Sequence, residues 1–294
     1  MAMLDAVGDH LNGTAPLVRP GPDAPPAALY LDLLKRCLTR FDLDQDLAPV
    51  VPGTPVRRRV WAELSRLLER RDILTFRRMA FQPRLRESGL DWPAHAETMI
   101  GLKRLDNLQR CIEDVVADGV AGDLLEAGVW RGGATILMRA VLAARGETSR
   151  SVWVADSFQG LPKPRAAHPA DKDDVHWSQP FLAVSEEEVK RNFTRYGLLD
   201  ERVKFLPGWF SDTLPTAPIE RLAVLRVDCD MYGSTTDVLT ALYPKVSVGG
   251  FTIVDDYGDI PSCRAAVEDY RAEHHITEPL EPIDANGVFW RRQN

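Results

Sequence analysis

Five aspartates in the sequence stand where they could share one chemical task. Asp228 and Asp230 end the apolar run LAVLRVDCD, Asp255 and Asp256 end GFTIVDD, and Asp156 ends the run SVWVAD. Residues two apart in a strand point to the same side, so the carboxylates of Asp228 and Asp230 would crowd each other. Two like charges this close either raise the pKa of one of the two acids or require a cation between them. One aspartate after a strand is usually a cap or turn residue. Five that end three apolar runs favour a functional site.

The framework that must bring these acids together is a parallel sheet. From about Thr98, apolar stretches of helix and strand character alternate, which is typical of parallel strands joined by crossover helices. The carboxyl ends of such strands share one edge, where open α/β sheets bind ligands. Asn286-Gly287 predicts a terminal antiparallel hairpin. We expect strands over 123–129, 151–157, 203–208, 222–230 and 250–256, and helices over 103–119, 134–145, 185–197, 234–246 and 262–274.

The first third of the chain differs in composition from the rest. Residues 1–27 are rich in Pro, Ala and Gly, which predicts a mobile arm. Residues 28–97 are predicted to form a helical appendage, and residues 98–294 the ligand-binding domain. Within the appendage we expect helices over 28–43 and 57–74, a break over 47–56 and an irregular, arginine-rich stretch that ends at Pro93.

Charge and cysteine usage narrow the class of protein. A net charge of −7 argues against nucleic acid or a membrane surface as the partner. Residues 57–86 are dense in arginine but include Glu63, Glu69 and Asp72, so a solvated helix pair at a subunit contact is favoured over a basic binding patch. Four cysteines without C-x-x-C spacing indicate reduced thiols. With no leader pattern and no 18-residue apolar run, we expect a cytoplasmic protein. The expected subunit contact predicts a homo-oligomer.

The first strand-to-helix turn, LLEAGVWRGGAT, indicates the kind of ligand. Its glycines resemble a nucleotide-binding loop, but Trp130 stands where a dinucleotide loop needs its second glycine, and no G-K-[ST] follows. Glu126 inside the turn would repel phosphates and suits a cationic ligand with an amino group. S-adenosylmethionine meets these conditions, because it carries a sulfonium, an ammonium and a ribose without phosphate. Asp156 would then accept hydrogen bonds from the ribose hydroxyls.

Four long motifs resemble those of the macrocin/mycinamicin/novobiocin-type sugar O-methyltransferases. They are LLEAGVWRGGAT, VWVADSFQGLP, LRVDCDMYGSTTDVL and GGFTIVDDY, and the similarity runs from about Asp91 to the C-terminus. The resemblance implies a Rossmann-like class I methyltransferase fold, with an open, mostly parallel seven-stranded sheet and a terminal antiparallel hairpin. It also implies a Mg²⁺-dependent enzyme that methylates deoxysugar hydroxyls of antibiotic scaffolds with S-adenosylmethionine.

The resemblance assigns roles to individual residues. Asp228, Asp255 and Asp256 correspond to the metal ligands, and three carboxylates without a nearby His or Cys pattern suit Mg²⁺ better than Zn²⁺. Asp230 is placed to take the proton of the acceptor hydroxyl. The expected cofactor-binding residues are Met99, Glu126, Gly128, Trp130, Thr135, Asp156, Ser157 and Asp212.

Alternatives remain at several of these positions. Asp230 could instead cap the following helix, although Ser234 is better placed for that. The polar loop over 163–183 is either a lid over the sugar or a solvated loop, and His176 within it is a rival base. Met99 could equally belong to the core. A glycosylated small molecule is the expected acceptor; a phenol or catechol acceptor, or a non-catalytic cofactor-binding protein, are the alternatives.

Overall fold

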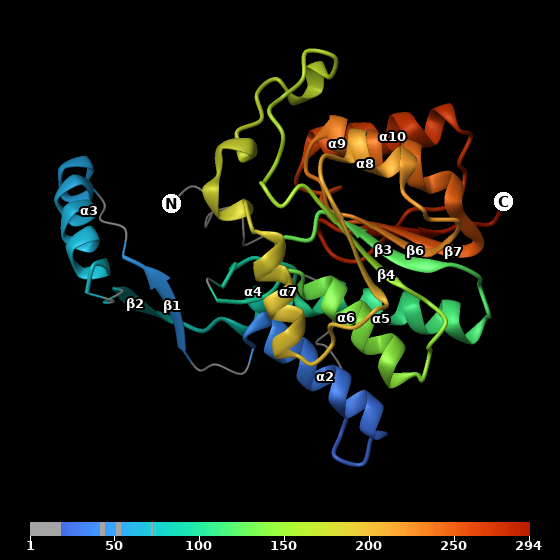
Figure 1. Ribbon diagram of the computed structural model, residues 1–294, viewed down its shortest axis with the longest axis horizontal. Helices are drawn as coiled ribbons and strands as arrows, with labels where there is room; N and C mark the ends of the chain where they lie inside the picture. Colours follow the sequence, from blue (N-terminus) through green and yellow to red (C-terminus); the bar gives the residue numbers. More distant parts are fainter. Residues whose placement is uncertain (1–18, 42–44, 51–53, 72, 74, 94) are drawn as a thin grey trace.

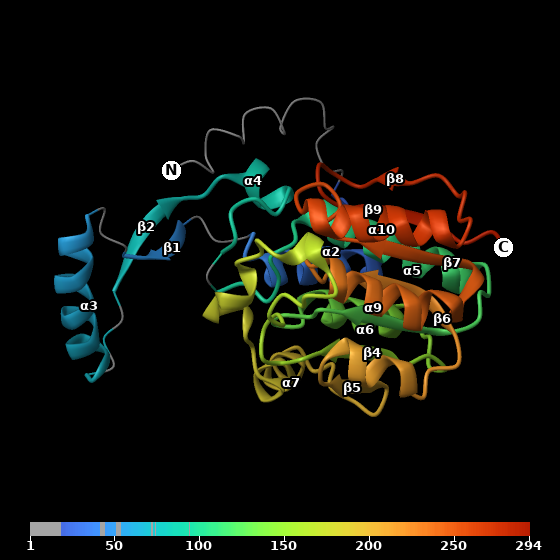
Figure 2. The same cartoon turned by 90° about the horizontal axis from the view of Figure 1, so that it is seen from above.

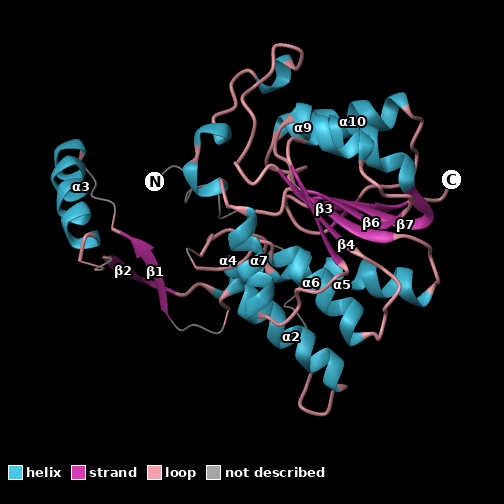
Figure 3. Ribbon diagram, in the orientation of Figure 1, coloured by secondary structure: helices cyan, strands magenta, loops and turns pink. Residues whose placement is uncertain are grey.

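A seven-stranded sheet organises the chain from Asp123 onward (Figure 1, Figure 3). The structure is a computed structural model that describes residues 19–41, 45–50, 54–71, 73, 75–93 and 95–294. Most of the mobile arm expected over 1–27 lies outside these residues. The strands are β3 (Asp123–Ala127), β4 (Val152–Asp156), β5 (Val203–Pro207), β6 (Leu222–Val227), β7 (Val246–Val254), β8 (Glu281–Pro282) and β9 (Val288–Arg291).

The strand order is β5-β4-β3-β6-β7-β9-β8. The first five of these strands run parallel, and β9 pairs antiparallel with both β7 and β8, so the predicted parallel sheet with a terminal hairpin is confirmed. The order reverses between β3 and β6, because the chain moves outward to β4 and β5 and then returns to β6. A crevice opens at the carboxyl ends of the strands at such a switch point.

Helices cover both faces of the sheet (Figure 1). On one face lie α2 (Pro26–Thr39), α5 (Leu102–Ala117), α6 (Gly133–Ala144) and α7 (Glu186–Arg195), and on the other lie α8 (Phe210–Thr213), α9 (Tyr232–Leu242) and α10 (Pro261–Glu273). Side chains alternate along β3, so Leu124 belongs to the first core and Leu125 to the second, and both are fully buried.

The predicted elements of the main domain are confirmed apart from their ends. In the appendage, the first predicted helix ends at Thr39 rather than 43, because Arg40 takes a left-handed conformation (φ 54°) and closes the helix. Strand β7 begins at Val246, four residues before the predicted start, and passes through Gly249, whose φ is +86°. No helix among the described residues is long and apolar enough to span a bilayer.

The appendage is not purely helical, which corrects the prediction for residues 28–97. Strands β1 (Gln45–Pro49) and β2 (Phe76–Ala80) form an antiparallel ribbon, with α3 (Pro55–Glu69) between them and α4 (Pro83–Glu87) after them. The predicted break at 47–56 therefore begins with a strand. Local patterning missed the ribbon because its partners, such as Gln45 and Ala80, lie far apart in the sequence and neither strand has clear alternation.

Candidate active site

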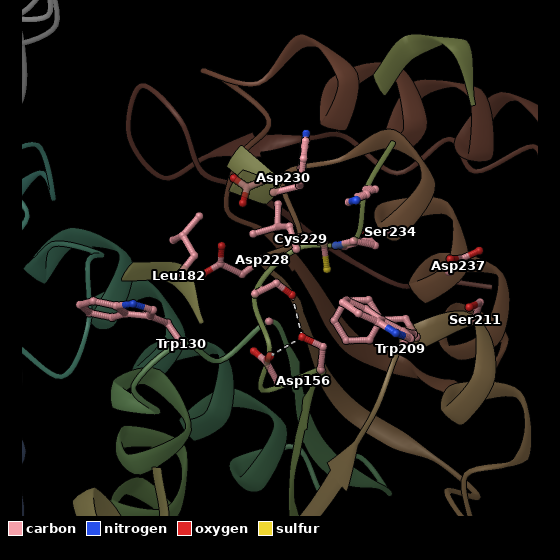
Figure 4. Close-up of a pocket in the computed structure, with 18 of the residues that line it drawn as sticks. Trp130, Asp156, Leu182, Trp209, Ser211, Asp228, Cys229, Asp230, Ser234 and Asp237 are labelled. Atoms are coloured by element: carbon pink, nitrogen blue, oxygen red, sulfur yellow. Dashed lines mark hydrogen bonds between the residues drawn. The ribbon is translucent and has the colours of Figure 1, made fainter. Parts of the chain in front are cut away.

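A cavity of about 630 Å³ opens at the carboxyl ends of β3, β4 and β6 (Figure 4). Several of the residues predicted to bind a ligand lie together on its wall. These are Met99, Gly128, Trp130, Asp156, Ser157, Asp228 and Asp230. Trp209, Phe210 and Ser211 close the side that faces α8.

The turn after β3 leaves no room for a side chain at Gly128. Its φ is +85°, and a Cβ built there would stand 1.7 Å from the carbonyl oxygen of Asp228. The backbone of the turn is held on both sides, since the amide of Gly128 donates to Ala155 (2.9 Å) and the amide of Asp228 donates to Ala127 (2.9 Å). The turn therefore brings the ends of β3 and β6 into contact.

Trp130 links this turn to the loop over 163–183. Its backbone is left-handed (φ 45°), and its indole Nε1 donates to the carbonyl oxygen of Phe181 (2.8 Å). The ring lines the cavity from the side of α6. The bulky residue that is incompatible with a dinucleotide loop therefore positions the loop that borders the cavity.

Asp156 fixes the shape of the cavity wall. One carboxylate oxygen accepts the amide of Val129 (2.8 Å), and the other accepts the amide of Phe158 (2.8 Å). Burial raises the pKa of Asp156, and these hydrogen bonds oppose that rise. The adjacent Ser157 donates to the carbonyl of Gly160 (2.6 Å). Asp156 thus lies on the cavity with its carboxylate already oriented.

Three predicted cofactor residues lie outside the cavity wall. Thr135 is fully buried, and its hydroxyl donates to the carbonyl of Gly132 (2.8 Å) at the start of α6. Asp212 accepts a hydrogen bond from Ser211 (3.0 Å) on α8, one residue beyond the wall. Glu126 is 2% exposed beneath the turn, forms an ion pair with Arg226, and has one oxygen, Oε2, without a partner among the described residues.

The acids that end β6 and β7 converge beside the cavity. Asp228, Asp255 and Asp256 each bring a carboxylate oxygen within 4.8 Å of the other two. Asp228 and Asp230 line the cavity, and the amide of Asp230 donates to Asp256 (3.1 Å). Asp230 has a left-handed backbone (φ 57°), which turns the chain sharply between β6 and α9.

Two buried arginines form ion pairs with this cluster, and the sequence analysis did not assign a role to either of them. Arg226 binds Asp228 (2.8 Å), Asp255 and Glu126, while Arg104 on α5 binds Asp255. Arg226 is 1% exposed. The sequence did contain a signal for this role, since Arg226 stands inside the apolar run LRV. An arginine buried in a sheet needs acidic partners around it.

The cluster carries more negative than positive charge. Burial, followed by the charge of Asp255, raises the pKa of Asp228 to about 6. Burial, followed by the charge of Asp228, raises the pKa of Asp230 to about 7. Burial, followed by the charge of Asp230, raises the pKa of Asp256 well above its usual value. Carboxylates crowded in this way are stabilised by a bound cation.

The loop over 163–183 also reaches the cluster. Buried Asp171 accepts the amides of Tyr232 (2.7 Å) and Gly233 (2.9 Å) at the start of α9. Asp171 therefore caps this helix, a role that the sequence analysis gave to Ser234. The Nδ1 atom of His176 lies 2.9 Å from Oδ2 of Asp174, and the influence of His176 on the pKa of Asp230, which it acts to lower, indicates that the two rival bases stand near each other.

Comparison with known proteins gives one consistent result. The model of the macrocin-O-methyltransferase (TylF) family matches residues 27–292. The mycinamicin III 3''-O-methyltransferase of Micromonospora griseorubida is 51% identical over 268 residues, which are 90% of this chain and 96% of that protein. The 8-demethyl-8-(2,3-dimethoxy-alpha-L-rhamnosyl)-tetracenomycin-C 4'-O-methyltransferase of Streptomyces olivaceus is 60% identical over 205 residues, which are 69% of this chain and 78% of that protein.

A solved structure agrees with these relatives. The O-methyltransferase NovP is 48% identical and superposes with a TM-score of 0.78, covering 91% of this chain and 100% of the NovP chain. Only about a tenth of this chain lies outside the match, so the match includes at least part of the appendage.

Proposed function

This chain belongs to the macrocin-O-methyltransferase family and is an S-adenosylmethionine-dependent O-methyltransferase, and from that premise we propose that it methylates a sugar hydroxyl with Mg²⁺ as a second cofactor. The observation that carries the proposal is the convergence of Asp228, Asp255 and Asp256 at the edge of the cavity. Membership in an enzyme family removes the alternative of a non-catalytic cofactor-binding protein.

The residues present fit a magnesium ion. All three side chains offer oxygen, which Mg²⁺ prefers, and the described residues hold no cluster of His or Cys ligands that would suit a softer metal. Asp228 uses Oδ2 for Arg226 and Asp256 uses Oδ2 for the amide of Asp230, whereas both oxygens of Asp255 face arginines. Asp228 and Asp256 are therefore the better placed ligands. Bound there, Mg²⁺ would act as a Lewis acid toward the acceptor hydroxyl.

The proposed cofactor site lies on the β3–β4 side of the cavity. Gly128 lets the ligand approach the backbone of the turn, Asp156 faces the ribose hydroxyls, and Met99, Trp130 and Ser157 complete the wall. Glu126 lies beneath the turn, and its oxygen Oε2, which has no partner among the described residues, would attract the amino group of S-adenosylmethionine. Thr135 and Asp212 support this site through the start of α6 and through α8.

Asp230 is the proposed base. It lies on the cavity wall beside the proposed metal site, and burial, followed by the charge of Asp228, raises its pKa, which makes its carboxylate a stronger base than an exposed aspartate. His176 would hold the Asp230 carboxylate electrostatically rather than take the proton itself. The protein would also align the acceptor hydroxyl with the methyl group of the sulfonium. The oriented carboxylates and the turn after β3 would hold the two reactants in that alignment.

The proposed acceptor is a deoxysugar on an antibiotic-type natural product. The support is in the printed names of the relatives, of which one is a 3''-O-methyltransferase of a mycinamicin and another a 4'-O-methyltransferase of a rhamnosyl tetracenomycin. A phenol or catechol acceptor is the alternative. We further propose cytoplasmic action on this small molecule by a homo-oligomer, with neither nucleic acid nor a membrane as partner.

The test is methylation of a panel of glycosylated natural products, with their aglycones and simple catechols as comparison. The expected result is a mass gain of one methylene on a glycoside, loss of turnover in EDTA and its recovery with Mg²⁺. Asp256→Asn should lose turnover, whereas Asp173→Asn, which changes an exposed aspartate of the 163–183 loop, should keep it. Turnover that survives both EDTA and Asp256→Asn would remove the metal from the mechanism.

A further inference from the structure

Helix α9 begins just after the proposed base and has no cap of its own. One residue, Met231, separates Asp230 from the first helical residue, Tyr232. The apolar side chain of Met231 cannot accept a hydrogen bond from the amides of the first turn. Such amides need an acceptor when they are taken out of water. The start of α9 therefore depends on a partner from elsewhere in the chain.

That partner is Asp171, on the loop over 163–183, which passes next to the start of α9 (Figure 1, Figure 2). Asp171 is 2% exposed. One of its oxygens accepts the amide of Tyr232 (2.7 Å), and the other accepts the amide of Gly233 (2.9 Å). A carboxylate suits this position because it offers two acceptors and because negative charge is favourable at a helix N-terminus. The backbone that Asp171 holds begins two residues after Asp230.

Two further contacts hold the same stretch of the loop on α9. We call residues 165–171 the clasp. Arg165 forms an ion pair with Asp237 on α9 (2.6 Å), and the ring of His168 lies 5.7 Å from that of Tyr232. Arg165 and Asp237 also line the cavity. The clasp therefore joins the start of α9 to the cavity wall.

The clasp fits closely against the helix because Gly233 has no side chain. A Cβ built there would stand 2.8 Å from the ring of His168 and 2.9 Å from Nη2 of Arg165, which is closer than such atoms approach. Gly233 lies inside α9, where glycine is less favourable than alanine. Glycine at this position therefore leaves room for the clasp and does not help to form the helix.

The direction of the Asp230 carboxylate depends on its backbone. In the described part of the chain Asp230 makes its hydrogen bonds through the backbone, since its amide donates to Asp256 (3.1 Å) and its carbonyl accepts from Ser262 (3.4 Å). Its φ of 57° turns the chain sharply, and α9 begins two residues later. A shift of the first turn of α9 would therefore reorient the carboxylate.

We propose that Asp171 is a positioning residue for methyl transfer, because its hold on the start of α9 directs Asp230 toward the acceptor hydroxyl. This inference rests on the proposed function of Asp230 as the base. The clasp also fixes the loop itself, and Trp177 of that loop lines the cavity. Loss of the clasp should therefore affect turnover and acceptor binding. Binding of S-adenosylmethionine should not change, because its proposed site lies on the β3–β4 side of the cavity.

The test compares three variants with wild type. Asp171→Asn keeps the shape of the side chain but has one carbonyl oxygen and an NH₂ group, so it cannot accept both helix amides. Gly233→Ala removes no hydrogen bond and favours the helix, but it pushes the clasp outward. Ser185→Ala is the control, because Ser185 caps a different helix, α7, through the amide of Glu188 (3.2 Å) at the other end of the loop.

The measurements are turnover of a glycoside, calorimetric titration with S-adenosylmethionine, thermal unfolding and hydrogen exchange of the first turn of α9. In Asp171→Asn, kcat should fall by roughly 10- to 100-fold, because a displacement of about 1 Å at the reacting groups has an effect of this order. The KM for the acceptor should rise, the affinity for S-adenosylmethionine should stay constant, and the amides of Tyr232 and Gly233 should exchange faster. Gly233→Ala should change kcat and KM in the same direction without a lower melting temperature. Ser185→Ala should lower the melting temperature and keep the wild-type kcat.

Three outcomes would overturn the inference. A wild-type kcat in Gly233→Ala would show that Asp171 is only a helix cap. Faster amide exchange with an unchanged kcat in Asp171→Asn would show that the start of α9 does not direct Asp230. An equal loss of kcat in Ser185→Ala would show that any loosening of the loop lowers activity. A wild type that methylates no glycoside would instead refute the proposed function, whereas the exchange measurement, which needs no acceptor, would still decide whether Asp171 holds α9.

Discussion

Replacing Arg226 by methionine should destabilise the folded protein by about 3–5 kcal/mol, the usual cost of leaving buried charges without their partner. Arg226 is almost completely buried and binds Glu126, Asp228 and Asp255. Methionine fills a similar space, so little of the loss would come from a cavity. Unfolding entropy is about 2.1 cal/mol/K per residue, which for this chain is roughly 0.6 kcal/mol/K, so the melting temperature should fall by about 5–8 °C.

The assay is calorimetric unfolding in EDTA at pH 5 and pH 8. Burial raises the pKa of Glu126 to about 8 and Arg226 opposes that rise, so removal of Arg226 raises it further. A carboxyl whose pKa is higher in the folded state binds more protons there, and stability then falls as pH rises above the pKa of the unfolded chain. The loss should therefore be larger at pH 8 than at pH 5.

Two further variants make this prediction specific. Glu126→Gln should restore part of the stability lost in Arg226→Met, because it removes one of the uncompensated carboxyls. Arg139→Met removes an arginine whose one ion-pair partner among the described residues is Asp200, a partly exposed acid, and it should cost less. A fall below about 2 °C in Arg226→Met, or a loss that is equal at both pH values, would refute the reasoning.

Three other predictions follow from the site. The pKa values of Asp228 and Asp230 are raised to about 6 and 7, so the cluster becomes fully anionic only above that range. Mg²⁺ should therefore raise the melting temperature more at pH 8 than at pH 5, and an equal shift at both pH values would contradict this. Asp230→Asn should lower kcat by roughly 10²–10⁴-fold while His176→Ala retains most activity, and the reverse result would make His176 the base. Gly128→Ala should abolish S-adenosylmethionine binding in calorimetry, whereas Gly146→Ala, also at positive φ but with open space around it, should only lower stability.

The sheet and the position of the acids could be predicted from sequence because both depend on local patterns. Each parallel strand contains a short apolar run, the runs of β4, β6 and β7 end in aspartates, and each crossover helix has its own periodicity. Once the strands are known to be parallel, their carboxyl ends must meet at one edge. Asp156, Asp228 and Asp255 could therefore be placed together although 99 residues of sequence separate the first from the last.

What could not be predicted depends on contacts between distant segments. The ribbon of β1 and β2 forms by pairing across an intervening helix, which no short window of sequence reveals. Asp171 caps α9 from a loop some sixty residues earlier, and Arg104 reaches Asp255 and Asp284 from α5. Residue type alone predicts that such groups need partners. Which partners they find is decided by the packing of the whole domain.

The register of the sheet explains why the proposed cofactor and metal sites share one support. Glu126 on β3 and Arg226 on β6 are direct partners across the parallel pair, so their side chains lie on the same face. Arg226 then reaches Asp228, two residues further along its own strand, and Asp255 at the end of β7. One guanidinium therefore fixes an acid beneath the glycine turn and two acids of the proposed metal site. A change of register by one residue would place Arg226 on the other face and separate all three.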